Sequence, residues 1–421
     1  MSVLAEPNRR RLLELLVGGE QSAGELATHF GVTRSAISQH LGVLARAGLV
    51  QSRQQGRHRY YRLDPEGMGR LRSSLDMFWS DELDALAAAR PARKESTQMT
   101  LEKSVVVPLG PEETFALLTE PERLRRWQTV TARIDLRAGG DFRWTIVPGH
   151  TAAGTVVEVE PGRRVVLGWG WEEGGEPPPG ASTVTITVEP AEGGTLVRLV
   201  HEGLSEEQAA GHAEGWDHYF DRLETAARTG DAGPDAWAAA PDPLDRLSAA
   251  EASLAVCQLV LRGLTTADAE RPSPCAKFTV HELVVHLLGS LHHLGAMVGA
   301  PATSSGPGNP ETLIADASDA AIESWRKRGT EGTVPFGGGE MPAQLAANIL
   351  SVELLVHAWD IATATGQPVV VSDAVSDYVL GLARELIAPP MRDGDRFAAE
   401  VAAGPDAGSL ERLVAFTGRT P

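Results

Sequence analysis

The sequence predicts a multidomain α+β protein built from three parts of different character. At 421 residues the chain is too long for one compact core, so two to four domains are expected. Two stretches at residues 89–98 and 228–243 have the composition of linkers, and the second, rich in Gly, Pro, Ala and Asp, is expected to be flexible. We therefore predict domains at residues 1–95, 100–230 and 241–421.

Charge is unevenly distributed along the chain. The net charge is −18, but residues 1–95 carry 14 Lys and Arg against 11 Asp and Glu. This balance excludes a protein that coats nucleic acid along its whole length and fits one that touches DNA with one end. We expect no apolar run that spans a bilayer, and Arg9, Arg10, Arg11 and Glu14 interrupt the place of a signal peptide. A cytoplasmic protein without membrane contact is therefore expected.

The first segment has the pattern of three consecutive short helices. Residues 10–19 show helical apolar spacing, and Ser22 with Glu25 forms a capping box that predicts a second helix at 25–30. Gly31 supplies a tight turn before a third helix. That helix is capped by Thr33, buries Ala36, Ile37, Leu41 and Leu44, and ends at Gly48.

Two short helices joined by a tight turn form a helix-turn-helix, whose second helix enters the major groove of DNA. Residues 49–63 follow as two alternating strands around Gly56, which predicts a basic hairpin, or wing, against the phosphates. The third helix and the hairpin supply the candidate DNA contacts: Thr33, Arg34, Ser35, Ser38, Gln39, His40, Arg53, Arg57, His58 and Arg59.

The phrases LAEPNRRRLLELL, ELATHFGVTRSAISQHLGVLARAGLV and GRHRYYRL resemble the ArsR family of winged-helix repressors over about 85 residues. The resemblance implies binding to double-stranded operator DNA as a homodimer, with the segment 66–90 that contains Trp79 in the dimer interface. This segment of the chain has no cysteine, so the thiolate metal switch of the founding members is absent. A winged helix used only for protein contacts is the alternative.

The middle segment has the pattern of an antiparallel meander closed by a long helix. A strand at 104–110 and a helix at 111–119 are followed by an apolar helix face at 206–227, formed by Trp216, Tyr219, Phe220 and Leu223. Alternating apolar residues bounded by turn residues predict five further strands, at 141–147, 154–160, 163–171, 182–189 and 195–202. Together these elements predict a helix-grip cup.

The phrases PEETFALLTEPERLRRWQ, RAGGDFRW, GTVVEVEPGRRVVLGW and GWDHYFDRLE resemble the SRPBCC, or START-like, superfamily, in the branch of the chaperone-activator homologues. The resemblance implies a hydrophobic ligand between sheet and helix. Five tryptophans are candidates to line that pocket: Trp127, Trp144, Trp169, Trp171 and Trp216. Simple core packing is the alternative role for them.

The last segment contains helices with candidate metal ligands. Thr279 and Glu282 form a capping box for an amphipathic helix at 279–298, which carries four histidines. A second helix at 351–367 places Glu353 four residues before His357, so both side chains project from one face and can bind one cation. A third ligand from a facing helix would complete an open site.

The phrases PSPCAKFTVHELVVHLLG, ELLVHAWDIATATGQ and LVAFTGRTP resemble the mycothiol-dependent maleylpyruvate isomerase N-terminal domain, within the DinB-like four-helix bundles. The resemblance implies a metal triad of His286, Glu353 and His357, a divalent metal such as zinc, and a mycothiol-like thiol cosubstrate. The other histidines, His281, His292 and His293, are expected to be structural, as are Cys257 and Cys275.

Three functions remain compatible with the sequence. The first is a transcriptional regulator whose acidic rear domains sense a small-molecule effector, a thiol adduct or a metal. The second is a metal-dependent thiol transferase or detoxification enzyme with an autoregulatory DNA-binding head. The third is a fusion of modules that work separately. The sequence alone leaves open whether the protein is an enzyme, because no proton-transfer partner for the triad is evident.

Overall fold

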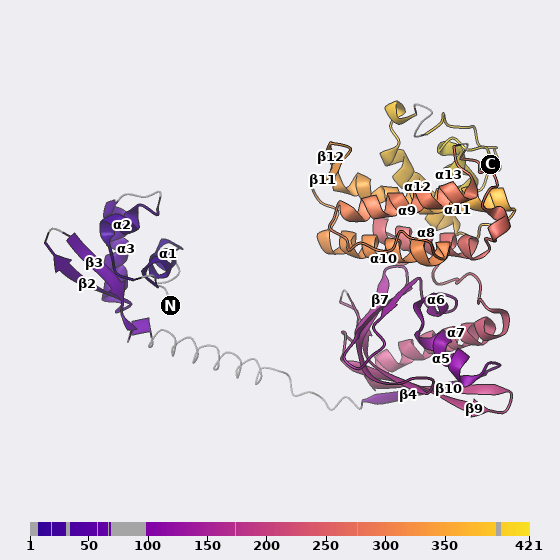
Figure 1. Ribbon diagram of the computed structural model, residues 1–421, viewed down its shortest axis with the longest axis horizontal. Coiled ribbons are helices and arrows are strands. Elements are labelled where there is room, and N and C mark those ends of the chain that lie inside the picture. The colour runs from indigo at the N-terminus through magenta and orange to yellow at the C-terminus, as the bar shows by residue number, and fades with distance from the viewer. Residues whose placement is uncertain are drawn as a thin grey trace. The chain divides into compact units, whose positions relative to one another are not determined.

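The computed structural model divides into two units, Met1–Glu95 and Ser96–Pro421, which are described separately. Figure 1 shows the elements of each unit. The described residues are 7–17, 19–30, 34–56, 58–65, 67–68, 98–172, 174–275, 277–392 and 397–421. The segment 66–90 that was assigned to a dimer interface lies almost entirely outside them, and so does Trp79.

The first unit contains helices around one small core beside a short sheet. Its elements are α1 (Pro7–Val17), β1 (Gln21–Ser22), α2 (Ala23–Ala27), α3 (Arg34–Arg46), β2 (Val50–Gln55) and β3 (His58–Leu63), with strand order β1-β3-β2. Ser22 and Glu25 form the predicted capping box. The second helix begins at Ala23 and ends at Ala27, earlier than the predicted 25–30, because Ser22 is itself the N-cap.

The end of α3 is fixed by Gly48, as predicted. Gly48 has φ of +71°, and its N–H donates to the Ala45 carbonyl while the Leu49 N–H donates to the Leu44 carbonyl. These two hydrogen bonds are the Schellman motif, which requires a left-handed residue. The motif turns the chain into β2 and leaves Ile37, Leu41 and Leu44 fully buried under α3.

The second unit begins with a seven-stranded antiparallel sheet that curves around a long helix (Figure 1). We call residues 98–230 the cup. The strand order is β4-β10-β9-β8-β7-β6-β5. The elements are β4 (Met99–Val107), α5 (Pro111–Thr119), α6 (Pro121–Leu124), β5 (Thr131–Ile134), β6 (Asp141–Val147), β7 (His150–Glu160), β8 (Arg164–Trp171), β9 (Ser182–Ala191), β10 (Gly194–Leu204) and α7 (Glu206–Thr229).

The cup differs from the predicted elements in several places: besides the two strands described next, helix α6 was not predicted, and β7 begins at His150, before the predicted 154. The first strand is 99–107 and not 104–110, because β4 pairs with β10 along its length, from Val107 opposite Thr195 to Met99 opposite Leu204. Strand β5 was not predicted; it is short and pairs only with β6 at the sheet edge. The predicted apolar face of α7 is confirmed, since all four of its named residues are buried.

The rest of the second unit is a helical bundle, residues 246–421. Its elements are α8 (Arg246–Arg262), α9 (Val280–Ala296), α10 (Pro310–Arg328), β11 (Thr333–Phe336), β12 (Gly339–Pro342), α11 (Ala343–Thr365), α12 (Asp373–Leu386) and α13 (Ser409–Phe416), with short 3₁₀ turns at Thr266–Asp268 and Pro389–Met391. The Thr279 and Glu282 capping box of α9 is confirmed. Helix α11 ends before the left-handed Gly366 and begins at Ala343, earlier than the predicted 351.

Helix α11 is long and apolar enough to span a bilayer, although no such run was expected from the sequence. An 18-residue window within its 23 residues has a mean hydropathy of 1.4, so by length and composition alone this helix could cross a bilayer. In the structure 78% of that apolar window is buried among the other helices of the bundle. Its apolar character is therefore accounted for by its central place in the bundle core.

The connector between cup and bundle is fixed, contrary to the flexible linker predicted at 228–243. The Arg222 guanidinium donates to the carbonyls of Trp127, Gly233 and Pro234. Trp237 stacks on His218 with ring centroids 4.1 Å apart and an interplanar angle of 7°. The composition of residues 228–243 predicted a flexible linker. Composition cannot show that Arg222 of α7 donates hydrogen bonds to backbone carbonyls of this stretch.

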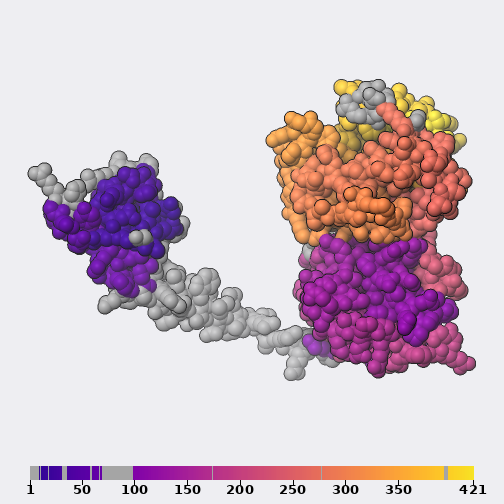
Figure 2. Space-filling model, in the orientation of Figure 1, coloured from indigo at the N-terminus to yellow at the C-terminus, as the bar shows by residue number. Residues whose placement is uncertain are grey.

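A buried polar interface joins the cup to the bundle. Figure 2 shows the two surfaces meeting along a continuous boundary. Arg125 of the cup forms a bidentate ion pair with Glu311 of α10, at 2.8 and 2.9 Å, with side chains 1% and 0% exposed. Burial alone would raise the pKa of Glu311, but Arg125 and Arg262 hold it below its ordinary value.

We expect Glu311→Gln to destabilise the second unit by about 3–5 kcal/mol, because it leaves the buried Arg125 charge without a full counter-charge. Urea unfolding followed by tryptophan fluorescence measures the change. Glu224→Gln, which breaks the exposed pair with Arg228 on α7, is the matched control and should leave the unfolding midpoint unchanged. Equal midpoints for the two variants would contradict the importance of the buried pair.

Candidate functional site

The bundle brings together the three residues named as metal ligands. His286 lies on α9, and Glu353 and His357 lie one turn apart on α11. Glu353 Oε2 is 3.4 Å from His286 Nε2 and 3.6 Å from His357 Nε2. One potential ligand atom from each residue lies within 4.8 Å of the others. The two helices therefore direct two imidazoles and one carboxylate at a common point.

The triad is held by residues that the sequence reasoning did not single out. His357 Nδ1 is 2.9 Å from Asp360 Oδ2, and Arg419 near the end of the sequence binds both oxygens of Asp360. A carboxylate on the second nitrogen fixes the ring and leaves Nε2 for a ligand, the usual arrangement behind a metal-binding histidine. Asp360 one turn after His357 was the local signal; nothing local identified Arg419 as its partner.

The charges in this site stabilise one another. Burial would lower the pKa of His357, but Glu353 and Asp360 raise it to about 9. Burial would raise the pKa of Glu353, and the two imidazoles lower it well below its ordinary range. A cation must therefore compete with a proton on His357.

The residues fit a divalent metal of the zinc type. Glu353 Oε2 is buried and, among the described residues, makes no well-aligned hydrogen bond, since the two imidazole nitrogens that face it lie at 3.4 and 3.6 Å; a cation would satisfy this acceptor. Two imidazoles and a carboxylate form a common ligand set for zinc with an open fourth position. The His286 side chain is 38% exposed and stacks on Phe278 at 5.0 Å, so the site is accessible from solvent.

The other histidines and cysteines of the bundle do not join the triad. His281 and His293 are exposed, and His292 binds the Thr303 hydroxyl at 2.8 Å. Cys257 is fully buried, which raises the pKa of its thiol to about 12. Cys275 is partly buried, and burial also raises the pKa of its thiol. Both thiols therefore stay protonated at neutral pH.

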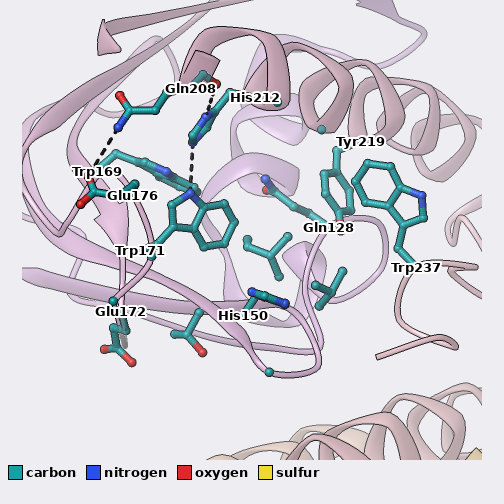
Figure 3. Close-up of a pocket in the computed structure, with 18 of the residues that line it drawn as sticks. Gln128, His150, Trp169, Trp171, Glu172, Glu176, Gln208, His212, Tyr219 and Trp237 are labelled. Carbon is teal, nitrogen blue, oxygen red and sulfur yellow. Dashed lines mark hydrogen bonds between the residues drawn. The ribbon is translucent and has the colours of Figure 1, made fainter. Parts of the chain in front are cut away.

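The cup contains a cavity of about 770 Å³ between the sheet and α7 (Figure 3). Trp169, Trp171 and Trp216 line it. Trp127 and Trp144 are not among the residues that line this cavity. Like Trp169 and Trp216, they are buried members of the hydrophobic core of the cup, so for these two the structure supports the alternative role of core packing.

Hydrogen bonds hold the aromatic wall of the cavity in place. The Trp171 indole donates to His212 Nε2 at 3.1 Å, and His212 Nδ1 donates to the Gln208 carbonyl (Figure 3). Burial lowers the pKa of His212, so its imidazole stays neutral and can accept from Trp171. The ring of Trp171 is thus fixed by α7 at the cavity wall.

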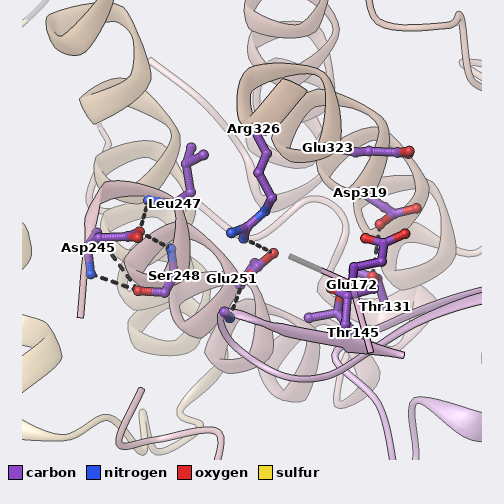
Figure 4. Close-up of polar contacts among 12 residues, drawn as sticks. Thr131, Thr145, Glu172, Asp245, Leu247, Ser248, Glu251, Asp319, Glu323 and Arg326 are labelled. Carbon is purple, nitrogen blue, oxygen red and sulfur yellow. Dashed lines mark hydrogen bonds and ion pairs between the residues drawn. The ribbon is translucent and has the colours of Figure 1, made fainter. Parts of the chain in front are cut away.

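The connector and the bundle complete the cavity wall. Trp237 and Pro243 of the connector line it, and so does Arg326 of α10. Glu251 of α8, which is buried, accepts from the Gly149 N–H at 2.6 Å and from Arg326 at 2.8 Å (Figure 4). The cavity is therefore a joint product of cup, connector and bundle, which sequence reasoning about the cup alone could not reveal.

In the first unit the described DNA-contact candidates lie at the surface. Ser38 and Gln39 on α3 are exposed and His40 is partly buried, while Arg53 and Arg59 are exposed on the hairpin. Arg53 is engaged in an ion pair with Glu20, at 2.8 Å from Nε to Oε1, which the sequence did not suggest. The remaining candidates lie outside the described residues, either wholly (Thr33 and Arg57) or in their side chains (Arg34, Ser35 and His58).

Three families match successive parts of the chain. The family described as Helix-turn-helix domain matches residues 4–53. The family described as Activator of Hsp90 ATPase homolog 1-like protein matches residues 108–228. The family described as Mycothiol maleylpyruvate isomerase N-terminal domain matches residues 250–336, which include His286 and end before Glu353 and His357.

Individual relatives each match a part of the chain. The HTH-type transcriptional regulator Rv2034 of Mycobacterium tuberculosis is 46% identical over 84 residues, covering 20% of this chain and 78% of the relative. The uncharacterized protein Rv0738 of the same species is 30% identical over 154 residues, covering 35% of this chain and 84% of the relative. A crystal structure of a possible transcriptional regulator for arsenical resistance is 59% identical, covering 21% of this chain and 94% of that one, with a TM-score of 0.19.

We expect Glu353→Gln to reduce the zinc content of the purified protein at least tenfold, because it removes the anionic ligand between the two imidazoles. Asp360→Asn should weaken zinc binding by 10- to 100-fold, since it acts only through His357. Elemental analysis and calorimetric titration with zinc measure both effects. His292→Ala removes another histidine of α9, the helix that carries His286, and should leave zinc binding unchanged. If this control lost as much zinc as Glu353→Gln, the metal would not be bound by the triad.

Glu20→Gln should strengthen DNA binding, because it releases the Arg53 guanidinium from its ion pair for contact with phosphate. The slope of log affinity against log salt should become steeper by up to about 1. Fluorescence anisotropy with a labelled duplex at several salt concentrations measures this slope. Glu14→Gln, which breaks the exposed pair with Arg11 on α1, is the control. An unchanged slope for Glu20→Gln would show that Arg53 does not contact the duplex.

Proposed function

This chain belongs to the ArsR-type helix-turn-helix transcriptional regulators and carries two additional domains, and we propose that these domains form a sensor for the DNA-binding head. In this proposal the cup binds a small-molecule effector and the bundle binds a divalent metal, zinc by its ligand set. Occupancy of either site changes the affinity of the first unit for double-stranded operator DNA. The protein acts as a cytoplasmic homodimer, so that two recognition helices engage two half-sites.

The observation that carries the proposal is the shared wall of the cavity. Arg326 lines the cavity, and the preceding residue, Trp325, is fully buried and donates to the Leu294 carbonyl of α9. Helix α9 also carries His286 of the metal triad. One helix end therefore touches both the effector cavity and the helix of the metal site, so a ligand that shifts α10 also acts on α9.

A metal-dependent thiol transferase with a DNA-binding head is the second candidate. The accessible position at the triad favours it, together with the match to the mycothiol maleylpyruvate isomerase N-terminal domain. A bound divalent metal would lower the pKa of a coordinated thiol and make it nucleophilic. The chain itself would contribute His286, Glu353 and His357 as holders of that metal, with Asp360 fixing the ring of His357.

The test measures binding of the full chain to a duplex from the upstream region of its own gene, by fluorescence anisotropy, with zinc and with a chelator. We expect binding that weakens steeply between 50 and 200 mM salt, and an affinity that differs at least fivefold between the two conditions. Glu353→Gln should bind DNA but lose that difference, whereas His292→Ala should keep it. Absence of any binding to the duplex at low salt would contradict the regulator.

A further inference from the structure

The cavity is lined by aromatic rings that come from three different elements. Trp169 and Trp171 belong to β8, Trp216 and Tyr219 to α7, and Trp237 to the connector (Figure 3). Trp169 is packed edge-on against Trp171, with centroids 6.1 Å apart at 86°. Such a wall presents both ring faces and ring edges, and the ring faces attract flat molecules and positive charge.

The charged residues of the wall are mostly acidic. Among the described residues, three carboxylates line the cavity, from Glu172, Glu176 and Asp245, against one guanidinium, from Arg326. The Arg326 guanidinium is bound to the buried Glu251, so its charge is already compensated. Glu176 is exposed at the cavity and, among the described residues, has a hydrogen bond only from the Gln208 amide, at 3.5 Å. The cavity therefore favours a positive charge over a negative one.

Two of these carboxylates already have partners: Asp245 accepts from the Leu247 and Ser248 N–H groups as the N-cap of α8, and Glu172 has an arginine partner. Glu172 pairs with Arg143, and the same guanidinium lies 3.3 Å from Asp319 of α10. Figure 4 shows Glu172, Asp319 and Glu323 side by side at the boundary between cup and bundle. The charge of Arg143 is thus balanced by acidic residues outside the cavity, so it does not make the cavity wall positive.

The cavity wall also offers neutral hydrogen-bonding groups. Tyr219 and Gln128 are 4% and 5% exposed and line the cavity, where Figure 3 shows them close together. Among the described residues, the Tyr219 hydroxyl has no well-aligned hydrogen bond, although burial and the nearby Asp235 carboxylate raise the pKa of Tyr219. A buried hydroxyl without such a bond is costly, and a polar atom of a ligand would satisfy it.

We infer that the cavity binds a flat aromatic organic cation. Its rings lie among Trp171, Trp216 and Trp237, its positive charge faces Glu176, and one of its polar atoms contacts Tyr219 or Gln128. The inference rests on the proposed sensor function and specifies the chemical class of the effector. Because Trp237 belongs to the connector, this ligand contacts the segment that joins cup and bundle.

The experiment compares three tricyclic probes of similar shape and different charge: N-methylacridinium, neutral acridine and anthracene-9-carboxylate. Binding to the DNA-free full chain at pH 7.5 is measured by calorimetry and by quenching of tryptophan fluorescence. We expect N-methylacridinium to bind at least tenfold more tightly than acridine, and the carboxylate to bind most weakly. Trp237→Ala should weaken binding of the cation several-fold, because Trp237 forms part of the aromatic wall.

Glu176→Gln should reduce the preference for the cation over acridine at least threefold. Glu189→Gln, an exposed change of the same charge on β9 outside the cavity, should leave that preference unaltered. Equal binding of cation and neutral probe, binding of none of the three, or an unaltered preference in Glu176→Gln would overturn the inference. If the cation binds as expected but leaves the affinity for the upstream duplex unchanged, the ligand class stands and the sensor function fails.

Discussion

The second unit depends on the buried ion pair between Arg125 and Glu311. A buried pair adds little net stability over apolar contacts of the same size, but each charge is costly without the other. A displacement of a few ångströms between cup and bundle would leave a buried charge unpaired. The pair therefore fixes the position of α10 on the cup, and Thr131, which binds Asp319 at 2.9 Å, supports the same position farther along the helix. The cavity wall exists only because this position is fixed.

The metal site shows a similar dependence on distant parts of the chain. His286 and the pair on α11 meet because α9 and α11 pack in one bundle, and the ring of His357 is set by Asp360. Asp360 is completely buried and is neutralised by Arg419, which follows the last helix. Local helix geometry supplies the ligands, whereas the fold of the C-terminal segment supplies the electrostatic support behind them.

A sensor needs an element that responds to both of its ligands. Here the end of α10 has this role: one residue faces the cavity and its neighbour is anchored on α9. The contacts are few and specific, a buried carboxylate on one side and an indole hydrogen bond on the other. Such contacts have discrete arrangements, and this is the property that allows a small shift at one site to change another.

The sequence by itself determined the local features. Capping boxes at Ser22 and Thr279, the glycine stop at Gly48 and the apolar face of α7 follow from periodicity and from backbone hydrogen bonding within a few residues. The spacing of Glu353 and His357 likewise placed both on one helix face. Only the tertiary structure decided which tryptophans line the cavity, that Arg222 immobilises the connector, and that Glu20 occupies Arg53. These outcomes depend on contacts between residues far apart in the chain. A local sequence pattern does not determine which distant residues form a hydrogen bond or an ion pair with each other.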